Sequence, residues 1–158
     1  MASIGTLCKD VPRVSVPSFA ALMTQERAMA DRFPLPSLLV AVDRYFDLMF
    51  DSDVSRFDQV FASSAQLHGL RDGQLRLLPA QDYRQALASR TSPKSKGAPR
   101  LQEILLVDIA SITQALVKVR VRIDTLQYLD YLSYHYSNDD WRITAKSFHV
   151  EHHYDEAN

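Results

Sequence analysis

Cysteine is almost absent from this chain, because Cys8 is the only one among 158 residues. A lone cysteine excludes an intramolecular disulfide and a zinc site built from cysteines. It also favours a reducing compartment. The N-terminus lacks the basic-then-apolar pattern of a secretory signal, since Lys9 and Asp10 interrupt it early. These absences predict a cytoplasmic protein.

The sequence also lacks a long apolar run and an excess of charge of one sign. No stretch approaches the roughly 20 apolar residues of a membrane helix, so no membrane partner is expected. Lys and Arg total 18 against 19 Asp and Glu, which gives a formal net charge of −1. Such a chain has no global basic field to attract nucleic acid. The four glycines are scattered and form no phosphate-binding loop, and no cofactor is expected.

Histidines gather at the C-terminal end, where His149, Glu151, His152 and His153 look like metal ligands. A polar tail cannot hold such ligands in a fixed geometry. We therefore expect no metal site.

What the chain does contain is enough apolar material for one core, at 46% hydrophobic residues. Helical spacing predicts helices over 19–33, 37–51, 54–61 and 79–90. Alternating β-branched and aromatic residues predict strands over 65–71, 74–78, 101–109, 115–124, 126–136 and 141–150. Helices before strands indicate an α+β fold. We expect a tail and accessory helix over 1–35, one domain over 36–151 and a C-terminal tail over 152–158.

Two short turns fix the register of the predicted hairpins. Asp72-Gly73 favours a two-residue type I′ turn that pairs Arg71 with Gln74 and His68 with Leu77. The more apolar face of this hairpin is expected to look inward, and it carries His68, Leu70, Leu75 and Leu77. The loop over 91–100, rich in proline and basic residues, is expected to be mobile. The basic cluster Arg90, Lys94, Lys96 and Arg100 could contact an anion or close over the pocket, although most such clusters are solvated loops.

The last hairpin is expected to turn at Asn138-Asp139, which pairs Tyr136 with Trp141 and Asp130 with Ser147. The predicted inner face carries Tyr128, Asp130, Leu132, Tyr134, Tyr136, Trp141, Ile143, Ala145, Ser147 and His149. The predicted outer face carries Leu129, Tyr131, Ser133, His135, Arg142, Thr144, Lys146, Phe148 and Val150. Asp130 is then a carboxylate shielded from water, and it needs a partner or a proton. Tyr45, Tyr128 and His149 are the candidate partners.

Four motifs and their spacing resemble the nuclear transport factor 2-like superfamily, in its SnoaL-like or "putative lumazine-binding" branch of small bacterial proteins. They are GLRDGQL at 69–75, SPKSKGAPR at 92–100, DYLSY at 130–134 and WRITAKSFH at 141–149. The resemblance covers roughly residues 37–150. It implies a cone-shaped fold whose N-terminal helices pack in a curved, mostly antiparallel sheet around a pocket. The superfamily holds both enzymes and plain binding proteins, so the fold does not choose between them.

A narrower resemblance concerns catalysis. RYFDLMFDSD at 44–53 is similar to the first helix of ketosteroid isomerases and places Tyr45 at their oxyanion-binding tyrosine. DYLSY similarly places Asp130 at their second oxyanion donor. Gly69 stands where those enzymes carry the proton-shuttling aspartate, and His68 is the neighbouring candidate base. Tyr45 and His68 can equally be ordinary core residues.

Three functions remain open from the sequence. The leading hypothesis is a pocket that binds a small cyclic or aromatic molecule through Tyr83, Tyr128, Tyr134, Trp141 and His149. The alternatives are an isomerase, dehydratase or cyclase that uses Asp130, Tyr45 and His68, and a non-catalytic dimeric scaffold. An uncovered apolar set on the outer sheet face predicts a homodimer, and this set is Leu129, Tyr131, Phe148 and Val150.

Overall fold

A computed structural model describes residues 18–21, 24 and 34–155 of the chain. The predicted helix over 19–33 lies almost wholly outside the described residues. The element order is α2 (Leu35–Asp51), η1 (Val54–Arg56), α3 (Phe57–Val60), β1 (Phe61–Arg71), β2 (Gln74–Pro79), α4 (Ala80–Ser89), β3 (Gln102–Ser111), β4 (Gln114–Ile123), β5 (Leu126–Ser137) and β6 (Asp140–His153). None of the helices in this part of the chain is long and apolar enough to cross a membrane.

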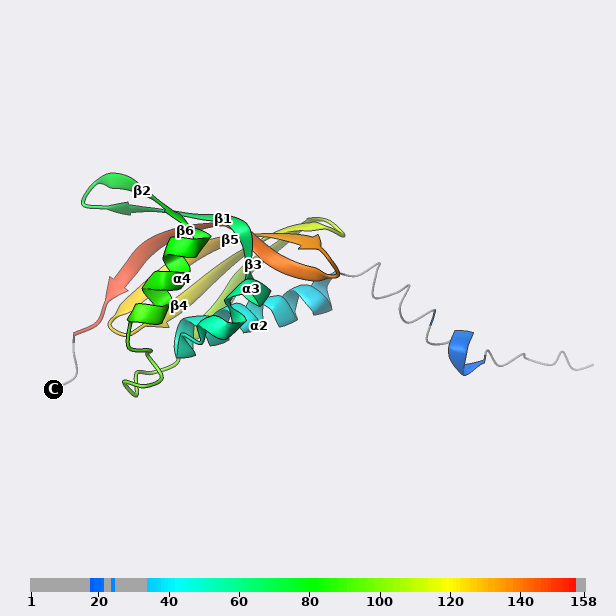
Figure 1. The fold of residues 1–158 in the computed structure, drawn as a ribbon, viewed down its shortest axis with the longest axis horizontal. Coiled ribbons are helices and arrows are strands. Elements are labelled where there is room, and N and C mark those ends of the chain that lie inside the picture. The colour runs from blue at the N-terminus through cyan, green and yellow to red at the C-terminus, as the bar shows by residue number, and fades with distance from the viewer. Residues whose placement is uncertain (1–17, 22–23, 25–33, 156–158) are drawn as a thin grey trace, which may run out of the picture.

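The strands form one curved, open sheet in the order β2-β1-β6-β5-β4-β3. All neighbouring strands are antiparallel except β1 and β6, which pair in parallel. The helices lie on one face of this sheet (Figure 1). The α+β prediction with a curved, mostly antiparallel sheet is therefore confirmed.

Helix α2 provides the helical side of the core. Its buried face repeats at helical spacing, and Leu38, Val42, Tyr45 and Met49 are fully shielded from water. The helix ends at Ser52, whose φ of 57° is left-handed. This face packs against inward residues of the central strands, so α2 carries Tyr45 directly over the sheet.

The first hairpin has the predicted register but the opposite facing. His68 pairs with Leu77, as the Asp-Gly turn requires. Leu70, Leu75 and Leu77 are nevertheless 71%, 69% and 54% exposed, whereas Leu67 is buried. The parity of β1 is set where the strand crosses the core, and the hairpin tip extends beyond the helices (Figure 1). The prediction that His68 faces inward is therefore wrong.

The last hairpin turns at Asn138 and Asp139, whose φ angles of 52° and 60° are left-handed, and Tyr136 pairs with Trp141. Further along, Ile143 pairs with Tyr134 but Ala145 pairs with Ser133. Thr144 is thus an extra residue, a β-bulge that reverses the facing of the residues from Ala145 to Val150.

This bulge corrects several predicted positions. Lys146 is buried and Phe148 packs against the core, although both were expected on the outer face. Ser147 and His149 are exposed, although both were expected inside. Asp130 keeps its predicted inward facing but pairs with Phe148 instead of Ser147.

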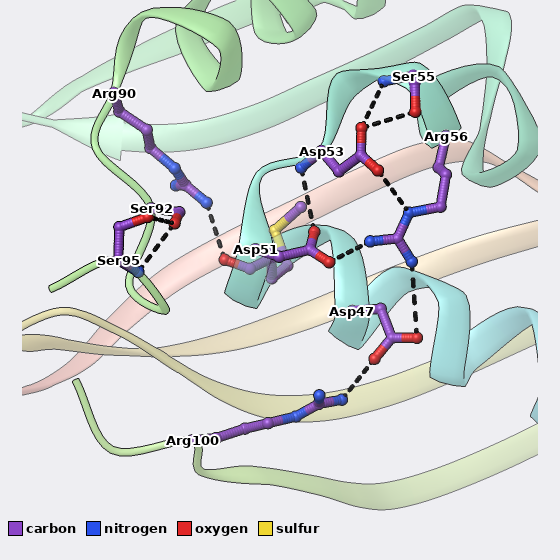
Figure 2. A network of polar contacts seen from close by, with 10 residues as sticks. Asp47, Asp51, Asp53, Ser55, Arg56, Arg90, Ser92, Ser95 and Arg100 are labelled. Atoms are coloured by element: carbon purple, nitrogen blue, oxygen red, sulfur yellow. Dashed lines mark hydrogen bonds and ion pairs between the residues drawn. The ribbon is translucent and has the colours of Figure 1, made fainter. Parts of the chain in front are cut away.

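The loop over 91–100 is anchored at both ends. Ser92 and Pro93 are buried, and the Lys94 amide donates to the Phe50 carbonyl at 3.0 Å. The Arg100 guanidinium contacts the Asp47 carboxylate at 2.7 Å (Figure 2). The loop therefore has contacts with α2 that its composition did not show.

Candidate functional site

A cavity of about 130 Å³ lies between α4 and the inner face of the sheet. Its apolar walls are Leu67, Leu78 and Ile123. Three aromatic rings and two basic side chains complete the lining, and these are Tyr83, Tyr128, Phe148, Arg90 and Lys146. The cavity is a small aromatic space with cationic groups at its boundary.

A glycine lets one of the rings lie where it does. Gly69 on β1 is paired with Phe148 on β6. A Cβ atom on Gly69 would lie 2.2 Å from the Phe148 Cζ atom, far inside van der Waals contact. Phe148 in turn packs edge-on against Tyr128, at a centroid distance of 6.3 Å. The side chain missing at position 69 thus shapes the aromatic wall.

Behind this wall lies a buried polar triad. Asp130 is fully buried and accepts a hydrogen bond from the Tyr45 hydroxyl through Oδ2. The Lys146 Nζ atom forms a salt bridge with the same oxygen at 3.0 Å and donates a hydrogen bond to the Tyr45 hydroxyl at 2.8 Å. In the part of the chain that the structure describes, Asp130 Oδ1 has no partner. Tyr45 was an expected partner of Asp130, whereas Lys146 takes the place expected for Tyr128 or His149.

The triad holds a charge pair. Burial by itself lowers the pKa of Lys146, but the adjacent Asp130 carboxylate outweighs it and the pKa lies above its ordinary value. Burial and the Asp130 charge raise the pKa of Tyr45 well above its usual range. At neutral pH Lys146 is therefore an ammonium ion and Tyr45 a neutral phenol. A protonated amine is not a nucleophile, so Lys146 can only donate hydrogen bonds or stabilise negative charge.

The Lys146 ammonium is also enclosed by aromatic rings. Its Nζ atom lies 5.2 Å from the ring centroid of Tyr45, 5.7 Å from that of Tyr83 and 5.9 Å from that of Phe148. Such distances favour cation–π attraction. The protein's own cation thus occupies the part of the site that could otherwise hold a cationic ligand.

Arg90 borders the cavity from the C-terminal end of α4. Its Nε atom donates to the Ser52 hydroxyl and its Nη2 atom to the Met49 carbonyl, both at 2.9 Å. Figure 2 shows the side chain reaching the C-terminal end of α2, where the helix dipole favours a cation. Among the described residues Arg90 forms no salt bridge, so only neutral groups meet its charge.

The sequence-predicted residues divide into three groups. Tyr83 and Tyr128 line the cavity, while Tyr45 and Asp130 lie next to it through Lys146. Tyr134 and Trp141 are buried in the core and are not among the cavity-lining residues. Trp141 instead donates through Nε1 to the Ser37 hydroxyl at 3.1 Å.

His68 and His149 belong to the third group and do not reach the site. His68 lies on the outer face of β1, beside Ser147 of β6. His149 is exposed because the bulge at Thr144 reverses the facing of the next residues in β6. The structure thus brings Tyr45 and Asp130 together but leaves the proposed base on the far side of the sheet.

Sequence reasoning missed Lys146 and Phe148, and it named Arg90 only as one of a basic cluster that could contact an anion or close over the pocket. A signal for the first two existed, because apolar residues fall on odd positions at Trp141 and Ile143 but on even positions at Phe148 and Val150. A change of phase within one strand indicates a bulge. The basic cluster did not show which of its members borders the cavity, since the position of Arg90 depends on how α4 packs against α2.

Helices packed on the concave face of a curved mixed sheet define the nuclear transport factor 2-like class, and solved structures show the same fold. A nuclear transport factor 2-like protein of unknown function from Shewanella baltica is 18% identical, with a TM-score of 0.64 over 74% of this chain and 93% of that one. One from Silicibacter pomeroyi is 17% identical, with a TM-score of 0.63 over 74% and 95%. A ketosteroid isomerase-like protein from Erwinia carotovora atroseptica is 12% identical, with a TM-score of 0.59 over 75% and 97%.

The family described as "Putative lumazine-binding" matches residues 37–149. The match spans most of the chain, and the chain belongs to this family. No curated protein matches it. At these identities the solved structures establish the fold alone, so the site carries the argument on function.

Proposed function

We propose that the protein binds a small cyclic or aromatic molecule in the cavity behind α4. The observation that carries this is the set of three rings, Tyr83, Tyr128 and Phe148, around about 130 Å³ of space. An engineered apolar cavity of roughly 150 Å³ accepts benzene, so this space suits one six-membered ring. The family description supports a ring-shaped ligand.

Filling the cavity tests this proposal. Leu78 and Leu75 both lie on β2, but Leu78 lines the cavity and Leu75 points to solvent from the opposite face. We expect Leu78→Trp to abolish the binding of neutral single-ring probes such as phenol and benzamide, while Leu75→Trp retains it. Amide chemical shifts of Tyr128, Lys146 and Phe148 report binding in an NMR titration. Probes that shift none of these amides in the wild type, or that bind both variants equally, contradict a ligand cavity here.

A proton-transfer enzyme is the second candidate, and the Tyr45–Asp130 hydrogen bond favours it. Both side chains occupy the positions that resemble an oxyanion site, but Asp130 accepts the Tyr45 hydrogen bond as a carboxylate, so Tyr45 and Lys146 are the two donors of the triad. The base is the weak point, since Phe148 covers Gly69 and His68 faces away. The Tyr45 hydroxyl already donates to Asp130, and Lys146 donates to Tyr45 and pairs with Asp130, so these groups interact within the triad. The geometry therefore supports binding better than catalysis.

For assembly, we propose a homodimer through the outer sheet face, with composition pointing to the cytoplasm. The residues differ from those expected, because Phe148 and Val150 belong to the inner face after the bulge. Tyr131 is exposed on the outer face, and further exposed apolar side chains there are Leu70, Leu75, Leu77 and Leu106. A purely non-catalytic scaffold would use this face without needing the cavity.

A further inference from the structure

We propose that the natural ligand is an anion, a single-ring carboxylic acid whose carboxylate meets Arg90 and whose ring lies among Tyr83, Tyr128 and Phe148. This rests on the proposed ligand cavity and adds the charge of its occupant. The observation behind it is the imbalance of charge around the cavity, since both of its charged lining groups are cations.

The two cations differ in whether a carboxylate neutralises their charge. Lys146 is neutralised by Asp130, which lies 3.0 Å from it and outside the cavity lining. Arg90 meets only the Ser52 hydroxyl and the Met49 carbonyl, so a positive charge remains at the boundary. Partial negative charge at the end of α2 offsets part of it. A bound carboxylate supplies the missing counter-charge.

Donors for such a group are available. The Arg90 Nη1 amino group has no hydrogen-bond partner within the described residues, and a guanidinium binds carboxylates in a planar, often bidentate geometry. Burial raises the pKa of the Tyr128 phenol, so its hydroxyl stays protonated and can donate too. The apolar walls formed by Leu67, Leu78 and Ile123 suit the ring rather than the charge.

The same geometry rejects cations. The aromatic enclosure formed by Tyr45, Tyr83 and Phe148 already surrounds the Lys146 ammonium. A second positive charge would have to lie near this ammonium and near Arg90, and like charges repel strongly where water is excluded. The site should therefore rank an acid above its neutral amide, and the amide above an amine.

Benzoate, benzamide and benzylamine provide a matched series of single-ring probes. We expect NMR titrations of the full chain at constant ionic strength to show benzoate binding about 10- to 100-fold more tightly than benzamide, the range for a hydrogen bond to a charged group. Benzylamine should bind more weakly than benzamide. Arg90→Gln should abolish the preference for benzoate. Lys94→Gln, which removes the same charge from an exposed position on the neighbouring loop, should retain it.

The comparison of benzoate with benzamide on the wild-type protein tests the anion assignment even if Arg90→Gln does not fold. Benzamide that binds as tightly as benzoate overturns the anion assignment but leaves the ring-binding cavity intact. An unchanged preference in folded Arg90→Gln overturns the role of Arg90. If no probe shifts the amides of cavity residues, the proposed cavity function fails together with this inference.

Discussion

Asp130 is the buried acidic residue of the polar triad, and the stability of the interior depends on it. Its carboxylate is fully buried, and Lys146 is the one cation that pairs with it among the residues that the structure describes. A buried ion pair adds little to stability by itself, because desolvation of both charges opposes their attraction. Removal of one partner is costly, since the other charge is left without compensation.

We therefore expect Asp130→Asn to destabilise the protein by about 3–5 kcal/mol at neutral pH, the usual cost of breaking a buried pair. The stranded Lys146 ammonium is the cause. Urea unfolding of the variant and the wild type measures the difference. Asp130→Asn combined with Lys146→Met removes both charges and should recover most of the loss. A double variant no more stable than Asp130→Asn would contradict the ion-pair explanation.

The same pair predicts a pH dependence. In the wild type the folded pKa of Lys146 lies above its ordinary value of 10.5, so its contribution is complete below 10.5 and is lost as pH rises through the folded pKa. In Asp130→Asn, burial alone lowers the pKa of Lys146. The unfolded variant then binds more protons than the folded one, and its stability rises with pH up to 10.5. The stability difference between variant and wild type should narrow from about pH 7 to about pH 10, and a constant difference would refute this assignment.

At the scale of single residues, the sequence correctly placed two of the three members of the triad. Parity along β5 correctly placed Asp130 inside, and helical spacing placed Tyr45 on the buried face of α2. Lys146 was assigned to the outer face because uninterrupted alternation from Trp141 and Ile143 places it on the side opposite to theirs. One inserted residue, Thr144, reversed that assignment.

Among the elements, turns determine register but not facing. The first turn fixed the pairing of its strands as predicted, as at His68 with Leu77, and the last turn did so as far as the bulge at Thr144, as at Tyr136 with Trp141. The leucines of the first hairpin were nevertheless expected inside, because apolar residues usually mark the core face. Here Ala65 and Leu67, nearer the helices, determine which face is buried. Which side of a strand is buried depends on the elements that pack against it. The pattern of apolar residues along the strand does not report that packing.

The loop over 91–100 leads to a prediction about its dynamics. Its composition favours mobility, but its backbone is hydrogen-bonded, with the Lys94 amide on the Phe50 carbonyl and the Ala98 amide on the Pro93 carbonyl. We expect hydrogen exchange at Lys94 and Ala98 to be slower than at Asp72 and Gly73 of the exposed first turn. Equal rates at these four amides would show that the anchors open freely.

Over the whole molecule, one row of paired residues crosses the outer face of all six strands. It runs through Leu77, His68, Ser147, Tyr131, Lys118 and Leu106. The described helices lie on the opposite face, so nothing among them covers this row (Figure 1). Its two ends and Tyr131 are exposed and apolar, which suits a partner surface more than solvent.

We expect light scattering to give twice the chain mass at micromolar concentration. Leu75→Asp places a charge in the proposed interface and should shift the equilibrium toward monomer. Val40→Asp is the control, because Val40 is similarly exposed but lies on α2, on the other side of the sheet. A wild-type monomer mass, or equal weakening by the two substitutions, argues against assembly through this face.

The parallel contact between β1 and β6 joins the first strand of the sheet to the last. During synthesis the ribosome releases β1 and β2 long before β6. Until β6 emerges, the pairing edge of β1 has no neighbour, and the aromatic wall over Gly69 does not exist because Phe148 has not been made. The cavity is therefore among the last features to form, and a nascent chain that stalls before β6 exposes an open strand edge, a known starting point for aggregation.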